Sequence, residues 1–175
     1  MRTNLLNQRD YEIPVTETSL FFGDKNVSIR ITAFLSLQCS HCARAFDKIK
    51  EMLKSETDCG INVVIITSDN KIMNTLYHYN RMNKDNEALS LLDQWYGLDS
   101  YSGSKLSENL CIPELNDISK EVNNENLSLY KSCNVIGTPT FFINGYLLPG
   151  QYDIDDIKYF TEVFSRKEEI VVSGN

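Results

Sequence analysis

Two apolar segments begin the patterned part of the chain. Residues 19–22 form a short apolar stretch, and residues 27–35 start with polar and apolar positions in alternation and end as a nearly continuous apolar run. Alternation is typical of a half-buried strand, whereas an unbroken run favours a central strand that is covered on both faces. The polar residues 23–26 between them predict a turn. We therefore expect two strands at the start of the fold.

The period of the pattern then changes from two residues to between three and four. Cys42, Phe46, Ile49 and Leu53 follow one another at steps of four, three and four residues, which places them on one face of a helix. Residues 58–60 interrupt this pattern, and the β-branched run at residues 61–67 predicts a buried strand. A strand, a helix and a strand in this order predict a βαβ unit with parallel strands and a right-handed crossover.

No strand pattern occurs between about residues 71 and 131, which predicts a helical insertion. Its apolar spacing predicts one helix around residues 73–79, a second around 88–96 that ends at Gly97, and a third that starts at Pro113 and continues toward Tyr130. Trp95 and Tyr96 are interpreted as core residues of this block, with a client-facing groove as the alternative.

The last third of the chain returns to strands. Residues 140–143 and 146–149 flank Asn144-Gly145, the strongest short signal for a β-hairpin. Asp153 is then expected to cap a final helix that carries Ile154, Ile157, Phe160 and Phe164. The predicted class is α/β, with a mixed sheet flanked by helices.

Length and composition restrict the possible domain organisation and partners. A length of 175 residues suits one domain, here expected over residues 19–170 after a polar lead-in at residues 1–18. A net charge of −7 without a basic stripe argues against a nucleic-acid partner. No apolar run approaches a membrane span, and no secretory leader is visible. A mature exported form, a domain excised from a membrane-anchored protein and a cytosolic protein all stay open.

Cys39 and Cys42 have the spacing of a redox pair and lie where a strand passes into a helix. At the helix N-terminus, unpaired N–H groups and the helix dipole lower the pKa of a thiol. We therefore expect Cys39 to attack a substrate disulfide and Cys42 to resolve the mixed disulfide. His41 and Ser40 lie between them as tuning residues, and a donor imidazole at His41 would favour the thiolate and hence an oxidant.

Zinc binding is the alternative interpretation of this pair. It would need two further ligands, and no second Cys-x-x-Cys accompanies the first. Cys111, Cys133 and His78 would have to converge by folding. We expect no metal and no cofactor other than the redox-active disulfide.

The segment Gly137-Thr138-Pro139 leads into the first strand of the hairpin, where Pro139 marks a strand start or a tight turn. Together, residues 34–42, residues 137–145 and the long helical insertion resemble the DsbA-like branch of the thioredoxin superfamily. The resemblance covers about residues 19–165, nearly the whole chain.

This resemblance implies that Pro139 is cis and packs against the cysteine pair, and that Thr138 binds an extended substrate segment by strand addition. It also implies protein or peptide thiols as partners, an extracytoplasmic location such as the periplasm, and a membrane quinone-linked partner of the kind related to vitamin K epoxide reductase. Members of this superfamily often carry a buried acid before the motif, but Ala33 occupies the expected position here. Proton transfer to Cys42 would then depend on water or another residue.

The function predicted is thiol–disulfide exchange with protein substrates, in the oxidase or isomerase direction. The alternatives are a reductase-direction thioredoxin, a non-catalytic client-binding or chaperone module, a zinc-binding structural domain and a glutathione-dependent reductase. A structural disulfide between Cys111 and Cys133 is a further hypothesis, with two buried thiols as its alternative.

Overall fold

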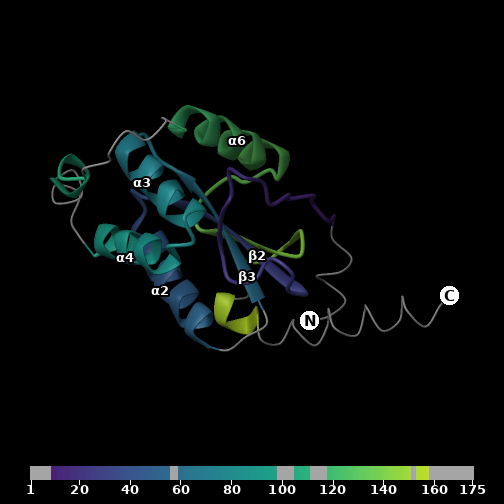
Figure 1. The fold of residues 1–175 in the computed structure, drawn as a ribbon. Coiled ribbons are helices and arrows are strands. Elements are labelled where there is room, and N and C mark those ends of the chain that lie inside the picture. The colour runs from purple at the N-terminus through teal and green to yellow at the C-terminus, as the bar shows by residue number, and fades with distance from the viewer. Residues whose placement is uncertain (1–8, 56–58, 98–104, 111–117, 151–152, 158–175) are drawn as a thin grey trace.

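The computed structural model describes residues 9–55, 59–97, 105–110, 118–150 and 153–157. Its centre is a five-stranded mixed sheet in the order β1-β3-β2-β4-β5 (Figure 1). The strands are β1 (Leu20–Phe22), β2 (Ile29–Ser36), β3 (Cys59–Ile66), β4 (Thr140–Ile143) and β5 (Tyr146–Leu147). The helices are α2 (Ser40–Lys54), α3 (Asn70–Arg81), α4 (Asp85–Tyr96) and α6 (Ser119–Ser132), with a 3₁₀ turn η1 (Ile154–Asp156).

The predicted βαβ unit is present. Strands β2 and β3 pair in parallel over eight residues, from Ile29 opposite Cys59 to Ser36 opposite Ile66, and α2 connects them. Both strands are buried almost throughout, as their apolar runs predict. Strand β1 joins β3 in the antiparallel direction, and β4 joins β2 likewise.

Strand β3 begins earlier than its sequence pattern predicts. Cys59 and Gly60 were expected to interrupt the chain before the strand, but they are its first two residues. A Cβ atom on Gly60 would lie 2.3 Å from Cζ of Phe21, so the missing side chain makes room for the ring of Phe21 on the neighbouring strand. The glycine therefore serves close packing within the sheet.

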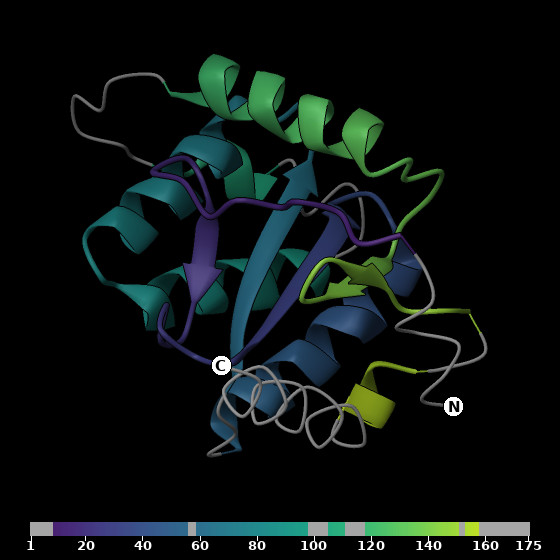
Figure 2. The same ribbon diagram turned by 90° about the vertical axis from the view of Figure 1, so that its right-hand side faces the viewer.

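Two hydrophobic clusters cover the two faces of the sheet. The larger one contains Ile31, Ala33 and Leu35 of β2 together with buried residues of α2, α3 and α4. The smaller one contains Phe34, Val64, Phe142, Cys133 and Ile13, with half-buried residues of α6 beside them. Figure 2 shows α6 and α2 on opposite sides of the sheet. The alternation along β2 thus directs successive side chains into different clusters.

The helical insertion is confirmed where the structure describes it. Helices α3 and α4 contain the predicted spans and each begins three residues earlier, and Gly97 caps α4 as expected. Helix α6 contains Val122 and Tyr130 of the predicted third helix; its expected start at Pro113 lies outside the described residues.

The C-terminal hairpin is also present. Asn144 and Gly145 both have positive φ angles, of 47° and 85°, and form the turn between β4 and β5. Asp153 and Asp156 form a reciprocal capping box around η1, which is the start of the expected final helix. Phe160 and Phe164 of that helix lie outside the described residues.

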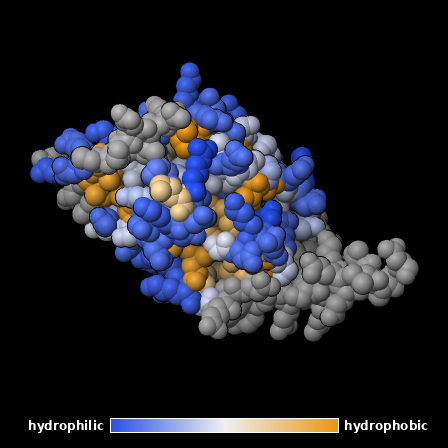
Figure 3. Space-filling model, in the orientation of Figure 1, coloured by the Kyte–Doolittle hydropathy of each residue, from blue (hydrophilic) through white to orange (hydrophobic). Residues whose placement is uncertain are grey.

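Hydrophilic side chains dominate the face of the molecule in Figure 3, and hydrophobic ones occur there as separate patches. Within the described part of the chain, no helix is sufficiently long and apolar to cross a membrane.

Candidate active site

Cys39 and Cys42 lie at the junction that the sequence predicts, where β2 passes into α2. Cys39 is the N-cap residue of α2, and its carbonyl oxygen accepts hydrogen bonds from the main-chain N–H of Cys42 at 3.0 Å and of Ala43 at 3.3 Å. The side chain of Cys39 is half-buried, whereas Cys42 is fully buried on the inner face of the helix. One sulfur is thus accessible and the other is shielded.

The surroundings of Cys39 stabilise its thiolate. Partial burial acts to raise the pKa of this thiol, but several hydrogen bonds outweigh it and hold the pKa below the ordinary value. The groups that lower the pKa are the side chains of Cys42 and Thr138 and the main chains of Cys42 and His41. Cys39 therefore supplies thiolate more readily than an ordinary cysteine does.

Cys42 has the opposite tendency. Burial raises the pKa of its thiol to about 11, and the neighbouring Cys39 sulfur acts in the same direction. The side chain of Thr138 partly offsets this rise, and so does the main-chain N–H of Ser36, which donates to the Cys42 Sγ at 3.4 Å. Cys42 is therefore a protonated thiol at neutral pH in the reduced protein before it reacts.

Thr138 and Pro139 lie beside the cysteine pair, although they are about a hundred residues away in sequence. The Thr138–Pro139 peptide bond is cis. The carbonyl oxygen of Thr138 accepts a hydrogen bond from the Cys39 thiol, with 3.4 Å between sulfur and oxygen. Parallel pairing of β2 with β3 and antiparallel pairing with β4 bring the two segments to one end of the sheet.

His41 and Ser40 occupy the first turn of α2, between the two cysteines. The His41 side chain is exposed, and its Nδ1 lies 2.5 Å from Nη2 of Arg44, which makes Nδ1 the acceptor of that hydrogen bond. The main chain of His41, in contrast, acts on Cys39 directly. The sequence pattern did not identify Arg44 as a neighbour of this histidine.

Three aromatic side chains of the helical insertion reach the segment that precedes the cysteines. Trp95 and Tyr96 of α4 and Tyr130 of α6 each donate a hydrogen bond to a main-chain carbonyl of residues 35–37. The sequence predicted Trp95 and Tyr96 as core or groove residues and Tyr130 as the end of a helix, because no local pattern shows which backbone atoms a distant side chain will contact.

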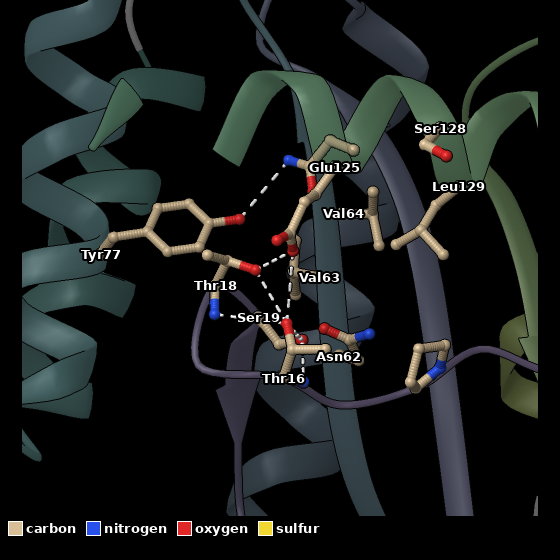
Figure 4. Close-up of a pocket in the computed structure, with 12 residues that line it drawn as sticks. Thr16, Thr18, Ser19, Asn62, Val63, Val64, Tyr77, Glu125, Ser128 and Leu129 are labelled. Carbon is tan, nitrogen blue, oxygen red and sulfur yellow. Dashed lines mark hydrogen bonds between the residues drawn. The ribbon is translucent and has the colours of Figure 1, made fainter. Parts of the chain in front are cut away.

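A separate hollow of about 250 Å³ lies between α6, β3 and residues 14–19 (Figure 4). It is lined by Thr16, Thr18, Asn62 and Glu125 among others, and the two threonine hydroxyls donate to the Glu125 carboxylate. None of the predicted redox residues lines it. The cysteine pair and the hollow are therefore distinct places in the molecule.

No three histidine, cysteine, aspartate or glutamate side chains approach one another closely enough to hold a metal ion within the described ranges. Cys133 is buried beside Phe34. Cys111 lies outside the described residues, so the predicted disulfide between the two stays a prediction.

Comparison with known proteins agrees with the fold. A family model described as thioredoxin matches residues 15–162, which is most of the chain. The protein therefore belongs to the thioredoxin family, whose members are thiol–disulfide oxidoreductases, and the recognition of that superfamily from sequence is confirmed. No curated protein sequence matches the chain.

Several solved structures share the fold at low sequence identity. ScsC of Proteus mirabilis in a transitional conformation is 18% identical, with a TM-score of 0.67 over 86% of this chain and 74% of that one. A periplasmic thioredoxin-like protein from Salmonella enterica serovar Typhimurium is 17% identical, with a TM-score of 0.66 over 86% and 92%. Oxidised BdbD from Bacillus subtilis is 12% identical, with a TM-score of 0.61 over 87% and 96%. The thioredoxin-like fold with its helical insertion is thus confirmed.

Proposed function

We propose that this protein exchanges disulfides with protein or peptide substrates through Cys39 and Cys42, with the disulfide between them as the only redox group. The observation that carries the proposal is the opposite character of the two thiols. Cys39 is accessible and has a lowered pKa, whereas Cys42 is buried and has a pKa of about 11.

In the oxidising direction, a substrate thiolate attacks the Cys39 sulfur of the Cys39–Cys42 disulfide. The sulfur of Cys42 leaves as a thiolate and takes up a proton, and a mixed disulfide joins Cys39 to the substrate. A second substrate thiolate then attacks the substrate sulfur of that bond and releases the Cys39 thiolate. Two electrons pass from the substrate dithiol to the cysteine pair. The reducing direction follows the same steps in reverse.

Thr138 and Pro139 are proposed to bind the substrate beside Cys39 by strand addition. Ile136, two residues earlier, is fully exposed at 103% of its reference area, so an apolar substrate side chain has a partner there. His41 and Ser40 are proposed to tune the pair, His41 through its main chain and through an imidazole that Arg44 holds.

The oxidase or isomerase direction is favoured because stabilising the Cys39 thiolate stabilises the reduced form and makes the disulfide a stronger oxidant. An extracytoplasmic location and a membrane quinone-linked partner fit that direction. The periplasmic relative from Salmonella supports this location, since it shares the fold over most of its length.

The decisive experiment uses single cysteine variants and a model peptide with two cysteines. We expect C39S to abolish turnover, and C42S to accumulate a mixed disulfide that mass spectrometry detects. C133A is the matched control, because Cys133 is buried on the other face of the sheet. Turnover by C39S at the rate of the unmodified protein would contradict the proposed role of Cys39.

The direction is measured separately, by equilibrating the pair against glutathione. A reduction potential near about −120 mV is expected of an oxidant, and one near about −270 mV would identify a reductase instead. Protection of an unfolded client by the C39S/C42S double variant, with no loss of effect, would favour the client-binding alternative.

A further inference from the structure

Three aromatic side chains bind three consecutive carbonyl groups just before the cysteine pair. Tyr130 Oη donates to the carbonyl of Leu35 at 3.1 Å and Tyr96 Oη to that of Ser36 at 3.2 Å. The indole Nε1 of Trp95 donates to the carbonyl of Leu37 at 2.9 Å. We call Trp95, Tyr96 and Tyr130 the aromatic bracket.

The bracket holds this segment from both faces of the sheet. Trp95 and Tyr96 belong to α4, which packs against α2, whereas Tyr130 belongs to α6, which packs against β3 on the other face. Pairing of β2 with β4 ends at Phe34, so residues 35–37 have left that antiparallel ladder. The hydrogen bonds of the bracket therefore begin at Leu35, directly after the last residue of β2 that pairs with β4.

Ser36 connects the bracket to both cysteines. Its N–H donates to the Cys42 Sγ at 3.4 Å, and its carbonyl accepts the Cys39 N–H at 3.3 Å as well as the Tyr96 hydroxyl. A rotation of the peptide groups at Ser36 would therefore change the contact with the buried sulfur and the start of α2 together.

The rings of the bracket are themselves fixed by packing. Tyr96 lies 5.4 Å from the ring of Phe46, and Tyr130 contacts Phe34 edge-to-face at 4.8 Å between ring centroids. A rigid ring places its single donor at one point, unlike a flexible side chain. Because position 33 is an alanine and supplies no carboxyl group, the groups that favour the Cys42 thiolate are the Thr138 side chain and the Ser36 N–H.

We propose that Trp95, Tyr96 and Tyr130 are positioning residues for the resolving step: they hold Ser36 so that its N–H stays directed at the Cys42 sulfur. This inference rests on the proposed function and assigns to the helical insertion a role in it. Cys42 must attack as a thiolate, so a misplaced N–H slows the attack of Cys42 on the mixed disulfide. The attack by Cys39 on a substrate depends on its own donors and is affected less.

The test compares Y96F, Y130F and the double variant with Y77F. Tyr77 is a buried tyrosine of α3 whose hydroxyl accepts a hydrogen bond from the Asn126 side chain, so Y77F removes a buried hydroxyl that is outside the bracket. Resolution is followed by stopped-flow release of a fluorescent thiol from a preformed mixed disulfide on Cys39. Losing one hydrogen bond is expected to slow resolution by roughly threefold to tenfold in Y96F and in Y130F, and by more in the double variant.

Two further readouts separate positioning from loss of packing. The alkylation rate of Cys39 should change by less than the resolution rate does. The rise of the resolution rate with pH should move to higher pH in Y96F and Y130F, because a misplaced Ser36 N–H raises the pKa of the Cys42 thiol further. Y77F should lose stability in urea and keep the resolution rate and the pH dependence of the unmodified protein.

The proposal is overturned if Y96F and Y130F both resolve the mixed disulfide at the unmodified rate, whatever their stability. It is also overturned if Y77F slows resolution as much as they do. Failure of the proposed function has a different signature, because C42S would then trap no mixed disulfide at all. Y130F keeps the test informative if Y96F fails to fold, since the two tyrosines lie on different helices.

Discussion

Cys39 and Cys42 are separated by two residues, yet the fold gives their thiols opposite properties. The helix start places Cys39 at the N-cap, where main-chain N–H groups and Thr138 surround its sulfur. One turn later, the same helix directs Cys42 into the core. The geometry of a single helical turn therefore separates the attacking sulfur from the resolving one.

A pH series of alkylation tests this difference. With the protein reduced, Cys39 is expected to react with iodoacetamide with an apparent pKa below 9, because hydrogen bonds stabilise its thiolate. Cys42 should stay unmodified up to about pH 10, since its pKa is about 11 and its sulfur is buried. Peptide mapping by mass spectrometry distinguishes the two sites. Equal labelling of both thiols at pH 7 would contradict the arrangement.

At the scale of elements, the hairpin of β4 and β5 holds the loop with Thr138 and Pro139 in place through pairing with β2. Gly145 in its turn has φ +85°, and a Cβ atom there would lie 2.3 Å from the carbonyl oxygen of Tyr11. The Tyr11 N–H in turn donates to the Gly145 carbonyl at 2.9 Å. The turn therefore requires close contact between the backbones at Gly145 and Tyr11.

Substitution of this glycine should be costly. G145A is expected to lose at least about 2 kcal/mol of unfolding free energy, because the added methyl group meets a backbone atom in a left-handed conformation. Urea unfolding followed by circular dichroism gives the value. G150A is the matched control, since a Cβ atom there has open space within 4 Å. Equal stability of the two variants would contradict this prediction, because it would mean that the turn accommodates the methyl group without strain.

At the scale of the whole molecule, the interior holds several groups that resist ionisation. Burial raises the pKa of Cys42 to about 11, that of Tyr77 to about 12, and those of Tyr96 and Tyr130 further. In the unfolded chain these groups ionise near their ordinary values of 9 for cysteine and 10 for tyrosine. Each group therefore lowers the stability of the folded state once the pH exceeds the ordinary pKa of that group.

Alkaline destabilisation follows in two stages for the reduced protein. Between about pH 9 and 11 the unfolded chain loses the Cys42 proton and the folded chain keeps it, so stability falls; above about pH 10 the tyrosines add to the loss. Cys39 acts oppositely, since its lowered pKa adds stability as the pH rises toward 9. Urea unfolding from pH 7 to 11 measures the curve. The C42A variant should show a smaller first stage, with the remainder from Cys133, whose pKa burial also raises. A curve identical to that of the unmodified protein would contradict the assignment.

Local sequence patterns were sufficient to predict much of the fold and the position of the cysteine pair. The apolar run of β2, the helical spacing from Cys42 to Leu53 and the Asn144-Gly145 turn each depend on neighbours in sequence, and each predicted element is present. The early start of β3 was missed because it depends on the ring of Phe21 from another strand. The spacing of apolar residues predicts the type of a segment, but it does not predict the shape of the side chains that pack against that segment.

The amino-acid sequence by itself determined that Cys39 and Cys42 share one helix start after a buried strand, because that arrangement requires only local periodicity and spacing. The tertiary structure alone decided what surrounds them. Thr138 reaches Cys39 through strand pairing, and Trp95, Tyr96 and Tyr130 reach residues 35–37 from helices 58 to 95 positions away along the chain. Such contacts arise from the packing of helices on both faces of a sheet, and no pattern within a single segment records them.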